Sequence, residues 1–583
     1  MSIDTVPGCA DASARASIAI SGASTRRAIL INGSNGTILA ELDAIECRAM
    51  KLFRPVVLVV VLGLVAAPDP LTAQRTIDLD AVTIADVNTA FANGTLTAER
   101  LVQMFLARIQ AFDRQGPMLR SIITVNPRAL DLARALDAER KAKGPRSVLH
   151  GIPVVIKDNI DTADMPTTGG SLLLEGSVPP DDAFVITKLR AAGAVIIAKA
   201  NLSEFASSVP DSSLGGLIRN PHDLTRVPGG SSGGTGVSLA AAFAMAGLGT
   251  DTGGSVRNPS TANGIAGLKT TMGLVSRDGV IPLALSFDTV GPMARHVQDV
   301  AALLGVIAGV DSSDASTKLG AGRAEADYTS SLRIDALRGA RLGIARDLVG
   351  FDTDVDWVVD SAAHVMRKHG ATIVDVRLPR WLLEAKSDYY LSIRNPEFAA
   401  QVADYLGTLD RKYPKTLDEL LERARLINAP GKDGRGPNPA RWSMMLRESM
   451  SGTTSDAHYL AVRDHAMPLV RAVLGAVLTS NRLDAIVYPT NPRRPQLAST
   501  PAPAVGGGGA DSGGNLANLS GFPDLIVPAG FSSDDLPIGI SFLGPAFSES
   551  RLLALGYSFE QATRARRLPV HTPLRGGESI AVP

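Results

Sequence analysis

Cysteine is almost absent from this sequence, which has only Cys9 and Cys47 among 583 residues. Both precede the part that is predicted to fold, so no disulfide framework, thiolate nucleophile or zinc finger is expected there. A His-Glu-x-x-His motif is also missing, and none of the eight histidines stands in a catalytic motif. We therefore expect no metal and no cofactor.

The sequence also has no excess of positive or negative charge. Lys and Arg together number 58, and so do Asp and Glu, which gives a formal net charge of zero. Because no basic field would attract phosphates, nucleic acid is not expected as a partner. Aromatic residues make up 4% of the chain, whereas glycine is plentiful at 56 residues, a composition that favours close packing of helices and strands.

Long hydrophobic runs are scarce. The apolar run Val56–Ala67 has about a dozen residues, whereas a membrane-spanning helix needs about 20. Lys51 and Arg54 precede the run and small residues follow it, a pattern that predicts a signal peptide over 50–74. We therefore expect a secreted or periplasmic protein without a stable membrane anchor. Residues 1–49 are interpreted as a disordered or mis-assigned extension, because Met50 stands directly before Lys51.

From about Thr76 onward, helix-like and strand-like patterns alternate. Apolar residues at helical spacing predict helices over 95–112 and 181–192. Asn126-Pro127 is expected to cap and open a helix that runs through Lys143. The alternation predicts one large α/β domain over 75–583. Further elements are a buried helix over 237–246 and strands over 152–156, 194–198, 341–345, 372–376, 485–487, 525–527 and 538–542.

Two clusters of glycine and serine are the strongest candidates for a site. The first runs from Gly229 to Gly234 and leads into the predicted buried helix, and the second runs from Gly247 to Arg257. Glycine lets backbone N–H groups approach a ligand closely, and several such N–H groups together can hold an anion. An oxyanion hole for acyl transfer has these requirements.

A serine nucleophile needs a base, and Lys157 is the lysine best placed to supply one. It closes the apolar segment 152–156, and burial lowers the pKa of a lysine by disfavouring its cation. Two other arrangements remain open from the residues alone. Gly229-Gly-Ser231-Ser-Gly233 has the spacing of an α/β-hydrolase nucleophile elbow, although the polar segment 220–228 before it does not have a strand pattern. A Ser-His-Asp triad would have to use His150, the histidine beside a candidate catalytic element.

Several long motifs in the chain are similar to those of the amidase signature family. Residues 228–234 followed by 249–257 resemble its defining stretch, and 151–159 resembles its lysine segment. The interval between Ser231 and Ser255 is also the one that the family uses. The likeness covers roughly residues 80–570, with further matches at 199–205, 267–269, 275–279, 288–295, 518–523, 527–530 and 536–539.

The resemblance implies a fold and a catalytic arrangement. The fold would be a single domain, with a mixed sheet of about eleven strands between helical layers. Ser255 would be the nucleophile of a Ser-cisSer-Lys triad, and Ser231 would link it to Lys157. By motif position, Thr252, Gly253 and Gly254, together with Ser255, would offer their backbone N–H groups to the oxyanion. Ser232, Asp251 and Arg257 would brace the loops.

The resemblance leaves three classes of function open. The least favoured is a non-catalytic binding protein on the same scaffold, because Lys157, Ser231 and Ser255 are all present. A free-standing amidase, similar to secreted bacterial peptide amidases, would hydrolyse a small-molecule or peptide amide. The alternative is the A subunit of a tRNA-dependent amidotransferase, which supplies ammonia from glutamine beside a partner protein. The predicted signal peptide and the zero net charge favour the free-standing amidase, for which a homodimer is the candidate assembly. Acyl specificity is expected in the helical region 350–480 and the glycine-rich loop 505–514.

Overall fold

The computed structural model describes residues 75–207, 209–427, 436, 438–499 and 511–582. The predictions for residues 1–49 and 50–74 therefore lie outside the described residues. Within the described ranges, no helix combines the length and apolarity that crossing a membrane requires.

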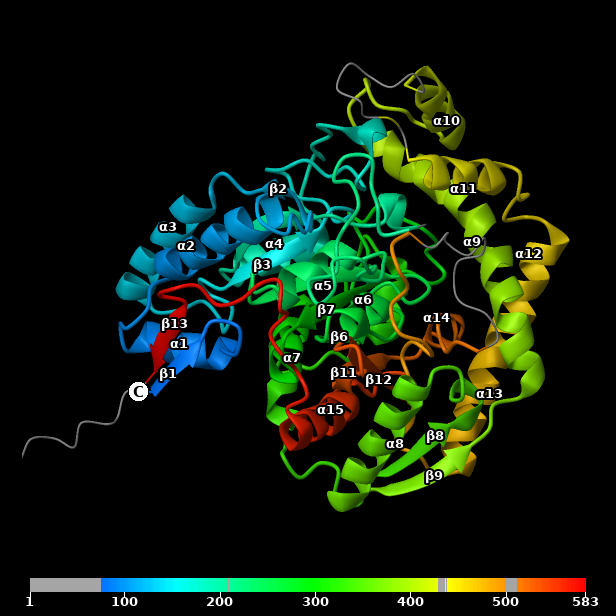
Figure 1. Cartoon of the computed structure of the whole chain (residues 1–583). Coiled ribbons are helices and arrows are strands. Elements are labelled where there is room, and N and C mark those ends of the chain that lie inside the picture. Colours follow the sequence, from blue (N-terminus) through cyan, green and yellow to red (C-terminus); the bar gives the residue numbers. More distant parts are fainter. Residues whose placement is uncertain (1–74, 208, 428–435, 437, 500–510, 583) are drawn as a thin grey trace, which may run out of the picture. The chain divides into compact units, whose positions relative to one another are not determined.

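An eleven-stranded mixed sheet forms the centre of the fold (Figure 1), as the family resemblance implies. Its strand order is β2-β4-β3-β5-β7-β6-β11-β12-β10-β8-β9, with parallel pairs around β3 and β8 and antiparallel pairs elsewhere. A separate pair, β1 (Arg75–Asp78) and β13 (Ser579–Val582), joins the two ends of the described chain. The sheet strands are β2 Ile122–Val125, β3 Pro153–Lys157, β4 Val195–Ala200, β5 Ala246–Asp251, β6 Ala266–Lys269, β7 Thr289–Ala294, β8 Arg341–Ala345, β9 Thr372–Val376, β10 Ala485–Pro489, β11 Asp524–Phe531 and β12 Pro537–Leu543.

Helices cover both faces of this sheet. Successive side chains of a strand point to opposite faces. On β11, Leu525 and Val527 pack against Gly556 of α15, whereas Ile526 lies beside Thr261 of α6. The α-helices of the domain are α1 Ile84–Ala92, α2 Ala98–Arg108, α3 Ala129–Lys143, α4 Phe184–Ala191, α5 Gly233–Ala240, α6 Arg257–Ala262, α7 Val297–Ile307, α8 Thr353–Lys368, α9 Arg380–Thr408, α10 Leu417–Leu426, α11 Pro439–Ser449, α12 Ala457–Ala461, α13 Met467–Ser480, α14 Leu516–Ser520 and α15 Glu549–Thr563.

The helices α9 to α13 have apolar clusters of their own. Tyr390 and Ile393 of α9 pack with Leu474 of α13, and farther along α9 Phe398 and Leu406 pack with residues of α10 and α11. Figure 1 shows these helices gathered along one side of the sheet. These helices lie within the region 350–480, for which the sequence analysis predicts a role in acyl specificity.

Two predicted elements differ from the structure. The helix expected over 237–246 begins earlier, at Gly233, and ends at Ala240, while Ala246 already belongs to β5. An apolar run without a period does not reveal where a helix gives way to a strand. Asn126 does not cap a helix: its side chain accepts from Arg128 N and donates to Ile196 O, and α3 begins only at Ala129.

Candidate active site

Lys157 is the last residue of β3, and it is completely buried. Its Nζ donates to Ser231 Oγ at 2.7 Å and to Thr250 Oγ1 at 2.7 Å. Thr250 belongs to β5, the parallel neighbour of β3, and Ser231 lies in the loop before α5. The peptide bond between Gly230 and Ser231 is cis. Strand β3 and the loop before α5 thus place the lysine of one motif against the serine of another, as the resemblance implies.

The surroundings of Lys157 favour its neutral form. Burial lowers the pKa of this lysine from its ordinary value to about 7, against the opposing charges of Asp251 and Asp288. An unshifted lysine would cost roughly 4–5 kcal/mol to deprotonate at pH 7. With the lowered pKa, the amine can accept a proton at neutral pH, as a general base must.

Ser255 lies in the loop between β5 and α6 and is half-buried. Its backbone carbonyl accepts from Ser232 N at 3.1 Å, so Ser255 is tied to the residue that follows Ser231. The hydroxyl of Ser232 donates to Thr250 O and accepts from Thr250 N, each at 3.2 Å. Ser232 therefore connects the loop of Ser231, strand β5 and the loop of Ser255.

The side chains of Asp251 and Arg257 hold the loop of Ser255 in place through hydrogen bonds. Asp251 accepts from Gly254 N at 2.8 Å, from Val256 N at 3.0 Å and from Arg257 Nε at 3.1 Å. Asn518, far away in the chain, donates to the same carboxylate at 2.9 Å. Burial opposes ionisation of Asp251, but the charge of Arg257 and these hydrogen bonds hold its pKa below the usual value.

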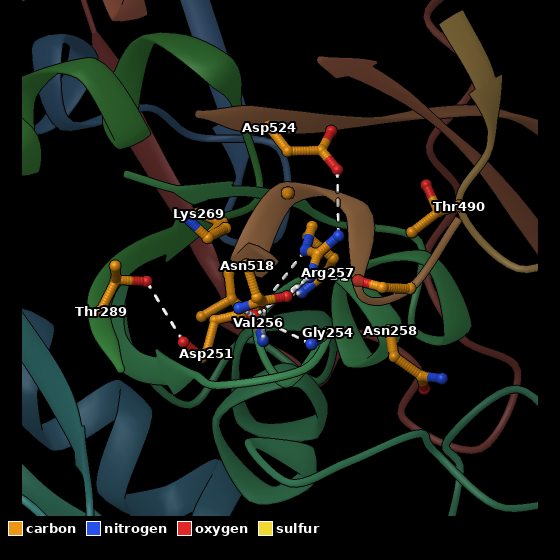
Figure 2. A network of polar contacts seen from close by, with 12 residues as sticks. Asp251, Gly254, Val256, Arg257, Asn258, Lys269, Thr289, Thr490, Asn518 and Asp524 are labelled. Carbon is orange, nitrogen blue, oxygen red and sulfur yellow. Dashed lines mark hydrogen bonds and ion pairs between the residues drawn. The ribbon is translucent and has the colours of Figure 1, made fainter. Parts of the chain in front are cut away.

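Arg257 also reaches the C-terminal part of the sheet. Figure 2 shows its guanidinium between Asp251 and Asp524, with the Nη1 to Asp524 Oδ2 distance at 3.2 Å. Its Nη2 donates to Gly514 O at 2.7 Å and to Asn518 Oδ1 at 2.5 Å. All the side chains in this network are buried, where a satisfied charge pair holds its partners in a fixed geometry.

Among the described residues, several backbone N–H groups of the Ser255 loop are left without a hydrogen-bond acceptor. The described residues provide no acceptor for the N–H groups of Thr252, Gly253 and Ser255, whereas the N–H of Gly254 is bound to Asp251. Gly254 has a φ of 122°, which a residue with a side chain rarely adopts. A Cβ on Gly253 would lie 2.9 Å from Tyr390 Oη and 3.2 Å from Asn515 Oδ1, so that position admits no side chain.

Sequence reasoning missed several residues around this loop. Thr252 Oγ1 donates to Asp288, which also accepts from Leu283 N at 2.9 Å and Ala284 N at 3.0 Å. Burial raises the pKa of Asp288 to about 6. Asp288 stands in a matched motif, but the motif alone assigns it no role. For Tyr390 in the middle of α9, no local pattern gives a signal, because its place depends on how α9 packs.

The alternative catalytic arrangements find no support in the geometry. His150 Nε2 is 2.9 Å from Leu136 O and its Nδ1 accepts from Arg146 N, so both ring nitrogens have backbone partners near α3. No strand element lies within 220–228, which contains only an isolated bridge at Arg226. The context of a nucleophile elbow is therefore missing before Ser231.

The comparisons with known proteins agree with one another. A family model described as Amidase matches residues 100–553. The A subunit of glutamyl-tRNA(Gln) amidotransferase from Chloroflexus aggregans is 38% identical over 496 residues, covering 83% of this chain and 97% of that protein. The structure of native peptide amidase from Stenotrophomonas maltophilia is 37% identical, with a TM-score of 0.76 over 85% of this chain and 99% of the other.

A second solved structure is more distant. The A subunit of glutamyl-tRNA(Gln) amidotransferase from Thermotoga maritima is 28% identical, with a TM-score of 0.65 over 85% of this chain and 98% of the other. Fold, motifs and family model agree over the same part of the sequence. The chain therefore belongs to the amidase signature family and is an amide-hydrolysing enzyme.

Proposed function

We propose that the chain is a free-standing amidase in which Ser255 is acylated and Ser231 relays protons to and from Lys157. One observation carries this proposal: a buried lysine amine with a pKa of about 7 lies 2.7 Å from the Ser231 hydroxyl. The Ser231 loop is bonded directly to the Ser255 loop through the backbone. These contacts support the proposed roles of nucleophile, relay and base, since a serine hydroxyl needs a neighbouring base to be activated.

In the acylation step, Ser255 Oγ attacks the amide carbonyl carbon and gives its proton to Ser231 Oγ. Ser231 passes its own proton to Lys157 Nζ, which becomes an ammonium ion. The N–H groups of Thr252, Gly253 and Ser255 stabilise the oxyanion, while Gly254 supplies the turn. The proton then returns from Lys157 through Ser231 to the leaving nitrogen as the C–N bond breaks.

Deacylation repeats the same transfers with water in place of Ser255. Water attacks the acyl-enzyme carbonyl, and its proton moves through Ser231 to Lys157. Collapse of the second tetrahedral intermediate returns that proton to Ser255 Oγ and releases the acid. The products are one carboxylic acid and one molecule of ammonia or amine for each amide and water consumed.

The substrate is proposed to be a small or peptide amide. The 37% identity to a peptide amidase and the zero net charge support this class. The test is turnover of a panel of alkyl amides, peptide amides and anilides by the purified chain alone. We expect ammonia release from peptide amides without a second protein, and no turnover of any amide by the pure chain would contradict the proposal.

A second candidate is the A subunit of a tRNA-dependent amidotransferase. It is favoured by the 38% identity that extends over 97% of such a protein. The same panel separates the two candidates when glutamine is included. Glutaminase activity that appears only after addition of a co-purifying second protein would favour the amidotransferase.

We further propose that residues 50–74 direct export to the periplasm or the medium, from the basic, apolar and small residues of that segment. N-terminal sequencing of the mature protein from a fractionated culture should find a start close after Ala73. A mature chain that begins before Met50, or one confined to the cytoplasm, would refute this. Light scattering on the same sample tests the proposed homodimer.

A further inference from the structure

The side chain of Asn515 does not cap a helix, although its position predicts that it would. It stands at the N-cap of α14, where asparagine ordinarily accepts a hydrogen bond from the first turn. Here the side chain makes no cap bond. The residue is fully buried, and within the described part of the chain neither its Nδ2 nor its Oδ1 has a hydrogen-bond partner. A buried amide without partners is costly, so it calls for an explanation.

The unpartnered amide faces the loop of the nucleophile. Its Oδ1 would lie 3.2 Å from a Cβ on Gly253, whose N–H is one of the proposed oxyanion donors. Tyr390 Oη would lie 2.9 Å from the same Cβ. Gly253, Gly254 and Ser255 are themselves half-buried, so the backbone beside Asn515 is accessible.

The position of Asn515 is fixed relative to that loop. Arg257, two residues after Ser255, donates to Gly514 O at 2.7 Å and to Asn518 Oδ1 at 2.5 Å, on either side of Asn515. The proton-relay side of the site is formed by β3 and the loop of Ser231, whereas Asn515 approaches Gly253 from the C-terminal segment. The amide thus reaches the loop from a segment of the chain that does not supply the relay residues.

We propose that Asn515 is a specificity-determining residue that binds the peptide backbone of the acyl part of the substrate. This inference rests on the proposed function, because it assumes that the acyl carbonyl is bound at the glycine loop. The Asn515 amide offers one acceptor and two donor hydrogens. The acceptor can pair with the N–H of a peptide group, or a donor can pair with the C=O of that group. Simple alkyl amides have no peptide group besides the scissile amide and would leave Asn515 unpartnered.

The test compares two substrates that differ in one peptide group. N-acetylphenylalaninamide and 3-phenylpropanamide share the phenyl group and the scissile primary amide, but only the first carries an acetamido group. For Asn515→Leu, kcat/KM for N-acetylphenylalaninamide is expected to fall by about 10- to 100-fold, and that for 3-phenylpropanamide by less than about threefold. Because the mutation removes an unpartnered buried amide, the Tm is expected to stay equal or rise.

Two further variants control the measurement. Asn515→Ala makes the same comparison without the bulk of leucine beside Gly253, and it should show the same selective loss. Asn481→Leu replaces another asparagine at a helix end, where its Nδ2 donates to Val477 O at 2.9 Å, and should leave the ratio of the two substrates unchanged.

Each outcome has a defined meaning. An equal loss for both substrates, or no loss for either, would overturn the role of Asn515 while leaving the amidase activity intact. Absence of turnover of both substrates by the wild-type enzyme would instead overturn the proposed function and this inference together. Selective loss for N-acetylphenylalaninamide in both Asn515 variants supports it.

Discussion

Substitution of Ser255 by alanine is expected to lower kcat for amide hydrolysis by roughly 10⁴- to 10⁶-fold. In the proposed mechanism the hydroxyl oxygen forms the acyl-enzyme, and without it the glycine loop and Lys157 can only polarise a carbonyl for attack by water. The measurement is ammonia release from a peptide amide at saturating substrate. A serine-directed phosphonofluoridate should label the wild-type chain at residue 255 and leave Ser255→Ala unmodified.

A matched control for this prediction is Ser392→Ala. Ser392 is a partly exposed serine of α9 whose hydroxyl lies 2.9 Å from His458 Nε2, so its geometry also resembles that of an activated serine. This variant should keep both its turnover and its labelling. If Ser255→Ala retained near-normal turnover, or if the label were found at residue 392, Ser255 would not be the nucleophile.

Substitution of Lys157 by methionine should lower kcat by about 10²- to 10⁴-fold, the usual contribution of a general base. The proposed mechanism requires the neutral amine, and the pKa of Lys157 is about 7. The wild-type rate should therefore rise with pH through about 7 and level off above it. In Lys157→Met the residual rate should lack this acid limb, and a limb that persisted unchanged would assign the titration to another group.

The same variant has a predicted effect on stability. The pKa of Lys157 is about 7 in the folded protein, against about 10.4 in an unfolded chain. Between these values the unfolded state binds more protons, so this residue makes folding more favourable as pH rises from 7 to 10. Relative to Lys157→Met, the wild-type free energy of unfolding should increase by about 3 kcal/mol over this range in urea titrations.

Lys269→Met separates burial of a lysine from its use in catalysis. Lys269 is also fully buried, with its Nζ bonded to the carbonyls of Thr270 and Phe522, and burial lowers its pKa to about 8. This variant should change the pH dependence of stability in the same direction as Lys157→Met. It should keep the acid limb of the activity profile, because Lys269 is not bonded to either serine of the site.

The sequence predicts those parts of the fold that depend on local pattern. The strands over 341–345 and 372–376 agree with β8 and β9 residue for residue, because each is a short apolar run between clear breaks. The sequence does not predict β6 and β7: Ala266–Lys269 and Thr289–Ala294 contain glycine or proline and are strands because both are buried beside other strands. Tertiary pairing, which no local window records, decides these cases.

The same distinction applies to the site. Lys157, Ser231 and Ser255 stand in long motifs, and the structure brings Lys157 and Ser231 into contact and ties the loop of Ser255 to them. Asn515 stands beside a motif without belonging to it, and its sequence position alone would assign it the ordinary task of a helix cap. Its orientation toward Gly253 follows from the way in which Arg257 fixes its neighbours, which only the folded chain reveals.

The contact between Arg257 and Asp524 joins residues that are 267 positions apart. During synthesis, the loop of Ser255 leaves the ribosome long before the carboxylate that clasps it. A nascent chain that stops short of Asp524 has Ser255, Ser231 and Lys157, but it lacks one of the two carboxylates that pair with Arg257. We therefore expect the site to be completed only late in translation, and fragments that end before Asp524 to be inactive.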